Sequence, residues 1–218
     1  MKDSRPVQVL AGLVTLAGAG VIYYSLGVGT STPMDSRAPA AVGMVMARQA
    51  ANLAKEGKQI IVITRDTTSF RNPATDIQLA SFKKELRRSG LSVGTVQALQ
   101  LDPLRPVEVP PGDFLELIRN SPKGSVIVSF MGPPLLNEAQ RKQLGEIKPS
   151  IVAFCSGSLP DQVDLRATFD QGLLHAAVVS RRRGSAPTTQ PADLQGWFDR
   201  SYLAITSANL ASLPPRQL

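Results

Sequence analysis

One loop of the chain combines residue types that bind polar ligands. It follows the apolar, β-branched run QIIVIT, and its candidate ligand-binding residues are Asp66, Thr68, Phe70, Arg71 and Asn72. An aromatic ring can cover the C–H face of a sugar, while carboxylate, hydroxyl, guanidinium and amide groups donate to and accept from sugar hydroxyls. The loop therefore predicts recognition of a small polar ligand, such as a sugar. The alternative is structural: Asn72-Pro73 starts a helix, and Phe70 belongs to the core.

A second candidate site is the run Cys155-Ser156-Gly157-Ser158, which leaves an apolar run and precedes a predicted helix. A nucleophile elbow needs glycines two residues either side of the serine, and neither serine has them. The single histidine, His175, lies inside an apolar run and is expected to be structural. Cys155 is expected to be a small buried hydrophobe. The Ser-Gly-Ser turn either donates backbone N–H groups to a ligand or is a plain turn.

Several enzyme classes are excluded by what the sequence lacks. It contains neither a G-x-G-x-x-G fingerprint nor a P-loop, and one Cys with one His rules out multi-cysteine and multi-histidine metal centres. We therefore expect no cofactor and no metal. The formal net charge is +7, but only 5% of residues are aromatic. The basic run 181–183 is accordingly expected to face anionic headgroups or cell-wall polymer rather than nucleic acid.

Apolar runs alternate with helical patterns along most of the chain. Strands are predicted at 59–64, 91–99, 125–130, 150–154 and 173–180. Helices are predicted at 40–55, from a Thr75 cap to Gly90, at 113–120, after an Asn137 cap, and at 161–168. This order is typical of a three-layer α/β fold, an open parallel sheet of about five strands with helices on both faces.

In such folds ligands bind beyond the carboxyl ends of the strands. This rule adds to the candidate ligand-binding residues Met131, Ser156, Ser158 and Arg181. The tail differs in composition from the rest of the chain. It consists of a Ser/Pro/Thr/Gln linker, 184–192, and a predicted helix, 193–213, which packs back on the domain.

The first 29 residues form a separate segment. No residue from Val7 to Gly29 is charged, and 23 residues of helix would extend about 34 Å, enough to cross a bilayer. The run is longer than the apolar core of a cleaved signal peptide, which is the competing interpretation. With Lys2 and Arg5 before it, the segment predicts a single-pass signal-anchor in the inner (cytoplasmic) membrane, with the larger domain in the periplasm or another extracytoplasmic space.

From Gln59 to about Arg182 the sequence resembles the first lobe of the type I periplasmic-binding-protein family. The resemblance rests on the segments QIIVIT, Asn72-Pro73, FKKELRRSGLSV, SVIVSF, IVAFCSGS and FDQGLLHAAVVSR. It implies that ligand contacts come from Asp66, Phe70, Arg71, Met131, Ser156 and Arg181. That family closes two lobes around its ligand, whereas this chain supplies one. The resemblance therefore implies a one-lobe derivative, or a second lobe from a partner protein or another copy.

Together these features predict a membrane-anchored, extracytoplasmic, solute-binding-like domain. It would recognise a small polar ligand or a partner protein without catalysis. The alternatives are a structural or interaction module of an envelope complex and a serine hydrolase using Ser156 or Ser158. The expected domains are the anchor, 1–29; a linker, 30–39; the α/β lobe, 40–183; and the linker with its C-terminal helix, 184–218.

Overall fold

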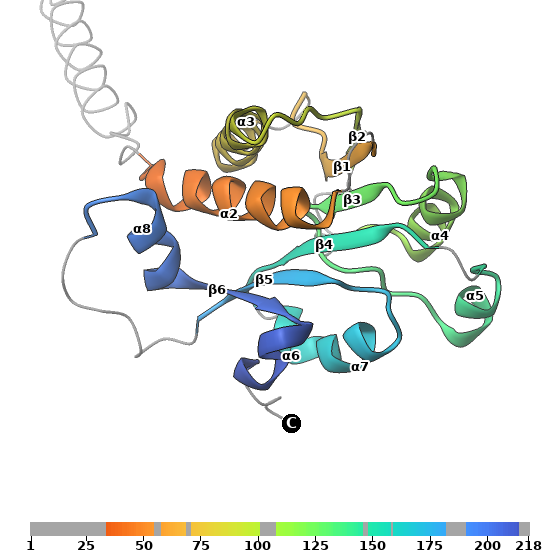
Figure 1. The fold of residues 1–218 in the computed structure, drawn as a ribbon. Coiled ribbons are helices and arrows are strands. Elements are labelled where there is room, and N and C mark those ends of the chain that lie inside the picture. Colours follow the sequence, from red (N-terminus) through yellow and green to blue (C-terminus); the bar gives the residue numbers. More distant parts are fainter. Residues whose placement is uncertain are drawn as a thin grey trace, which may run out of the picture. The chain divides into compact units, whose positions relative to one another are not determined.

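The computed structural model describes residues 34–54, 58–68, 71–100, 108–145, 148–157, 159–181 and 191–213 (Figure 1). The chain divides into two compact units, residues 1–35 and 36–218, and the elements below belong to the second. None of the helices in the described part of the chain has the length and apolarity that crossing a bilayer requires. The predicted anchor, residues 7–29, lies outside the described residues.

A six-stranded sheet forms the centre of the second unit. Its strands are β1 (Ile60–Arg65), β2 (Thr95–Leu99), β3 (Val126–Ser129), β4 (Ser150–Cys155), β5 (Ala176–Ser180) and β6 (Tyr202–Thr206). They lie in the order β2-β1-β3-β4-β5-β6, all parallel except β6, which pairs antiparallel with β5. β3 and most of β1, β4 and β5 are buried, because helices cover both faces of the sheet.

Two helical layers enclose this sheet (Figure 1). One face carries α2 (Arg37–Leu53), α3 (Pro73–Arg88) and α8 (Leu194–Ser201). The other carries α4 (Pro111–Asn120), α5 (Glu138–Lys142), α6 (Leu159–Gln162) and α7 (Leu165–Asp170). Residues alternate between the two cores along each strand, so that Val62 faces α2 and α3 while Ile63 faces the other layer. The predicted three-layer α/β architecture is confirmed.

Helices α2 and α3 approach each other closely at Gly43. A Cβ atom added there would lie 2.1 Å from the carbonyl oxygen of Gln78. Side chains extend the contact: Arg48 Nε donates to Glu85 Oε1 at 2.9 Å, and Arg48 Nη1 donates to Gln195 Oε1 of α8 at 2.9 Å. One arginine of α2 thus joins all three helices of this layer.

The predicted helix at 193–213 is wrong. α8 ends at Ser201, residues 202–206 form β6, and Ser207–Ser212 form the 3-10 helix η1. The helical spacing of Leu194, Trp197 and Phe198 continues by coincidence into the run YLAIT, so the sequence pattern predicts one long helix. That run is itself rich in aromatic and β-branched residues, which favour a strand. Pairing with β5 decides the outcome, because it buries Ile205 completely against the second core. The sheet therefore has six strands and is mixed rather than parallel.

Other boundaries also differ from prediction: β2 begins at Thr95 rather than residue 91, and β5 begins at Ala176 rather than residue 173. The cap of α3 is Asn72, whose Oδ1 accepts from Thr75 N at 3.4 Å, and the helix begins at Pro73 rather than after Thr75. The fixed φ of proline suits the first helical position. The helix predicted at 161–168 is two short helices, α6 and α7, the second capped by Asp164. The Asn137 cap of α5 is confirmed as a capping box with Gln140.

Candidate functional site

The carboxyl edge of the sheet has a switch point between β1 and β3. β1 is flanked by β2 on one side and β3 on the other, so the chain leaves β1 in one direction and later returns on its opposite side. Backbone hydrogen bonds continue past the strands here, from Asp66 N to Leu99 O at 2.8 Å and from Phe130 N to Ile63 O at 2.9 Å. In open α/β sheets, ligands bind in the crevice at this point.

The loop after β1 is shaped by its own hydrogen bonds. The Asp66 carboxylate accepts from Thr68 N at 2.9 Å and from Thr68 Oγ1 at 3.0 Å. These two bonds, with a further one from the Gln100 side chain, hold the pKa of Asp66 below its ordinary value of 3.8. Thr67 Oγ1 donates to Asp76 Oδ1 at 3.1 Å, which ties the loop to the first turn of α3. The bonds from Thr68 hold the Asp66 carboxylate in one orientation, and the group is ionised at neutral pH.

Two other predicted residues of this loop have clear positions. Arg71 is exposed, and Asn72 caps α3 through its side-chain oxygen. The structural alternative for Asn72-Pro73, a helix start, is thus realised. Phe70 and Ser158 lie outside the described residues. Of the predicted ligand-binding residues that the structure describes, Arg71 is the positively charged one nearest to Asp66 in the sequence.

A buried hydroxyl at the end of β1 was not among the predicted residues. Thr64 is 3% exposed, and within the described residues its Oγ1 has no hydrogen-bond partner. Such a group usually finds a partner, because an unpaired buried hydroxyl is unfavourable. The sequence did contain an indication of this residue, because Thr64 is a polar residue at the carboxyl end of an otherwise apolar predicted strand. Gln100, whose side chain contributes to the lowered pKa of Asp66, was not among the predicted residues either.

Met131 follows β3 and is held by both its side chain and its backbone. Its side chain is 2% exposed and belongs to the core beneath α4 and α7. Its N–H donates to Ser129 Oγ at 3.2 Å, and the next residue, Gly132, turns the chain with φ +97°. A side chain at position 132 would be strained in this left-handed conformation. Met131 is a predicted ligand-binding residue, but its burial gives its side chain little access to the edge.

Ser156 and Arg181 lie on other strand ends, apart from the Asp66 loop. Neighbouring strands are about 4.8 Å apart, so the ends of β4 and β5 are roughly 10 and 14 Å from that of β1. Gly157 N donates to Ser180 Oγ at 3.3 Å, and Arg181 Nε donates to Tyr202 O at 3.1 Å. The predicted set therefore divides into a β1–β3 group and a β4–β5 group. In the second group, Arg181 is engaged with β6, while Ser156 is exposed.

Among the described residues, the groups considered for catalysis do not assemble. Cys155 is fully buried, and burial raises the pKa of its thiol strongly. His175 Nδ1 accepts from Ile151 N at 3.2 Å at the amino end of β4, and burial lowers the pKa of the imidazole. Ser156 follows the carboxyl end of that strand, about 16 Å away, so His175 is out of reach as its general base. The described residues also contain no cluster able to hold a metal ion.

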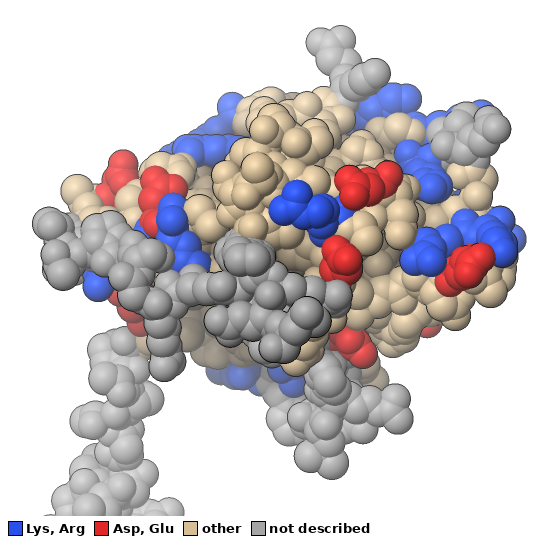
Figure 2. Space-filling view, turned by 90° about the horizontal axis from the view of Figure 1, so that it is seen from below, with Lys and Arg blue, Asp and Glu red and all other residues tan. Residues whose placement is uncertain are grey.

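Charges of both signs are distributed over the surface. Figure 2 shows basic and acidic side chains interspersed over one face of the molecule. Lys142 Nζ, for example, lies 2.7 Å from Glu138 Oε1 on α5. The surface shown is thus a mixed one, although the formal net charge of the chain is +7. Arg182 and Arg183, the last two residues of the basic run, lie outside the described residues.

Comparison with solved structures identifies the class of fold. The structure resembles an arabinose-binding protein from Geobacillus stearothermophilus, with a TM-score of 0.51 and 11% identity over 81% of this chain and 63% of that one. It also resembles the sugar-binding protein of a sugar ABC transporter from Bacillus halodurans, with a TM-score of 0.50 and 14% identity over 81% of this chain and 64% of that one. The fold is the type I periplasmic-binding-protein fold, and the expected resemblance is confirmed at that level.

The resemblance is one of structure only. No protein-family model matches the sequence, and no curated protein matches it. The chain spans a little less than two thirds of the length of the two solved structures above.

Proposed function

We propose that the domain captures a small polar ligand, such as a sugar, without covalent chemistry. The observation that carries this proposal is the fixed polar loop Asp66–Thr68 beside the β1–β3 switch point. A carboxylate held charged is a strong acceptor for ligand hydroxyls, and exposed Arg71 adds donors close by along the chain. The buried hydroxyl of Thr64, two residues before Asp66, is a further polar group near the end of β1.

A thermal-shift screen of the full chain against a sugar panel tests this function. A binding sugar should raise the melting temperature, since a ligand that binds only the folded state stabilises it. Arg71→Ala should remove the shift, while Arg119→Ala, an exposed arginine in the last turn of α4, should keep it. Equal shifts in both variants, or none with any sugar, would count against the proposal.

The location proposed for this function is extracytoplasmic, at the inner membrane. The support is the uncharged run 7–29 with Lys2 and Arg5 before it, together with the fold. Alkaline extraction of membranes should leave the full chain in the pellet and release a variant that lacks residues 1–29. Release of both proteins would contradict the anchor.

A second candidate is an interaction module of an envelope complex, with a partner or a second copy beside the lobe. It is favoured by the internal pairing of edge groups after β4 and β5: Gly157 N donates to Ser180, and Arg181 donates to Tyr202. Paired groups leave fewer free donors for a small ligand. Cross-linking the full chain in membranes distinguishes the two, because the module predicts a discrete adduct that persists when no sugar is present.

A further inference from the structure

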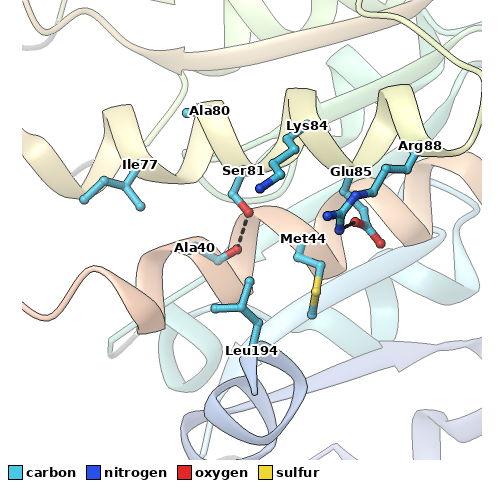
Figure 3. A pocket seen from close by; sticks show the side chains of 9 residues that line it. All are labelled: Ala40, Met44, Ile77, Ala80, Ser81, Lys84, Glu85, Arg88 and Leu194. Atoms are coloured by element: carbon cyan, nitrogen blue, oxygen red, sulfur yellow. Dashed lines mark hydrogen bonds and ion pairs between the residues drawn. The ribbon is translucent and has the colours of Figure 1, made fainter. Parts of the chain in front are cut away.

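A groove lies on the opposite side of the α2–α3 layer from the sheet. Its volume is about 360 Å³, within the range of small-molecule sites. α2, α3 and α8 line it with Ala40, Met44, Ile77, Ala80, Ser81, Lys84, Glu85, Arg88 and Leu194 (Figure 3). Ser81 Oγ donates to Ala40 O at 2.7 Å, so this hydroxyl is already satisfied and leaves the wall mainly apolar.

The groove is polar at one end only. Ile77 and Ala80 line one end, while Glu85 and Arg88 line the other (Figure 3). From Ile77 to Arg88, α3 rises by about 16 Å, so the groove is elongated along the helix. Met44 and Leu194 form its apolar floor. A molecule that fills it must be apolar along most of its length and polar at one end.

The charge at the polar end is positive. Glu85 is 12% exposed, and its two oxygens lie 2.9 Å from Arg48 Nε and 3.0 Å from Arg88 Nη1. These contacts, that with Arg48 first, lower the pKa of Glu85 and keep it ionised. Lys84 is exposed, and within the described residues it has no ion-pair partner. Of the charged residues that line the groove, two are basic, Lys84 and Arg88, and one is acidic, Glu85, and this excess of positive charge favours an anionic head group.

We propose that this groove binds a single-chain amphiphile with an anionic head, of the fatty-carboxylate class. Its alkyl chain lies over Met44, Ala80 and Leu194, and its carboxylate lies at Lys84 and Arg88. This site lies on the helical layer rather than at the carboxyl edge, so the proposal is independent of sugar capture. Burial of the alkyl chain supplies the affinity, at roughly 25 cal/mol per Å² of apolar area.

The chain has its own reporter for this site. Trp197 is the single tryptophan of the sequence and lies one turn beyond Leu194 on α8, with the Arg37 guanidinium 4.2 Å from its ring centroid. Dodecanoate brominated at its terminal carbon, added below its micelle concentration, should quench Trp197 fluorescence saturably. The dodecyltrimethylammonium analogue, which has the opposite head charge, should compete weakly.

Two lysines on α3 provide a matched control. Lys84→Glu should weaken binding by about tenfold, the effect of losing about 1.4 kcal/mol. Lys83→Glu makes the same charge change one residue away, where the side chain lines a different hollow, and should leave binding within about twofold. Ala80→Phe, at an exposed position on the groove wall, should abolish saturable quenching while the far-ultraviolet circular dichroism stays unchanged.

Three results would overturn the proposal. One is the absence of saturable quenching by the brominated probe. Another is equal weakening by the two lysine variants, which would indicate a general charge effect. The third is competition by the cationic analogue as strong as that by an anionic amphiphile of the same length. This result would mean that the groove is only an apolar surface, suited to a helix or to a second copy of the chain.

Discussion

Asp66 illustrates how a single residue can be both structural and available to a ligand. Its carboxylate accepts two hydrogen bonds from Thr68, which favour the charged form and lower its pKa. A carboxylate has lone pairs beyond these two, so hydrogen bonds that shape the loop still leave acceptor capacity for a hydroxyl group. The hydrogen bonds that shape the loop are thus the same ones that favour the charged form of Asp66.

The lowered pKa of Asp66 makes a pH-dependent contribution to stability. The folded-state pKa lies below the unfolded value of 3.8, so the contribution is complete above that pH and is lost as the pH falls through the folded-state pKa. Asp66→Asn should therefore be less stable than wild type by a constant margin near neutral pH, and the margin should shrink below about pH 4. Urea unfolding at a series of pH values measures the difference in stability between the two proteins. A difference that widens on acidification would contradict the lowered pKa of Asp66.

At the scale of elements, burial decides which predictions succeed. β1, β3 and β4 match their predicted ranges closely because each is a continuous apolar run bounded by turn residues. β6 was mistaken for helix because it is an edge strand that is fully buried only at Ile205, so its local pattern is weak. Its pairing with β5 is a contact across the fold, which no window of neighbouring residues contains.

The same limit applies to the candidate site. The loop after β1 was predicted, because the end of an apolar strand is visible in the sequence. The separation of Arg181 from that loop depends on strand order, which is a property of the whole sheet. Thr64 was missed because a threonine that ends a strand has an ordinary local pattern, and its unpaired hydroxyl becomes apparent only in three dimensions.

The contact of α2 with α3 provides a prediction at this scale. Gly43→Ala should destabilise the protein by about 1–3 kcal/mol or more, because the new methyl group would overlap the Gln78 carbonyl and force the helices apart. Gly112→Ala in α4 is the matched control. Nothing lies within 4 Å of the added Cβ, so it should be neutral or stabilise by up to about 1 kcal/mol. Equal effects in chemical denaturation would show that the helices tolerate separation.

At the scale of the whole unit, the two proposed sites occupy different parts of one lobe. The carboxyl edge offers the fixed charge of Asp66, while the α2–α3–α8 groove offers an apolar floor with a basic end. According to the two proposals, a single scaffold presents one site for a hydroxyl-rich ligand and another for an amphiphile. Because different residues form them, a variant at one site should leave binding at the other unchanged.

Backbone amide chemical shifts of the full chain, recorded during titration with the sugar that gives the largest thermal shift, test the central claim most directly. Capture at the switch point predicts the largest perturbations in residues 64–72 and 129–132, with smaller ones at the ends of β4 and β5. Perturbations centred on α4 or α5, or spread evenly over the surface, would contradict a ligand site at the carboxyl edge of the sheet.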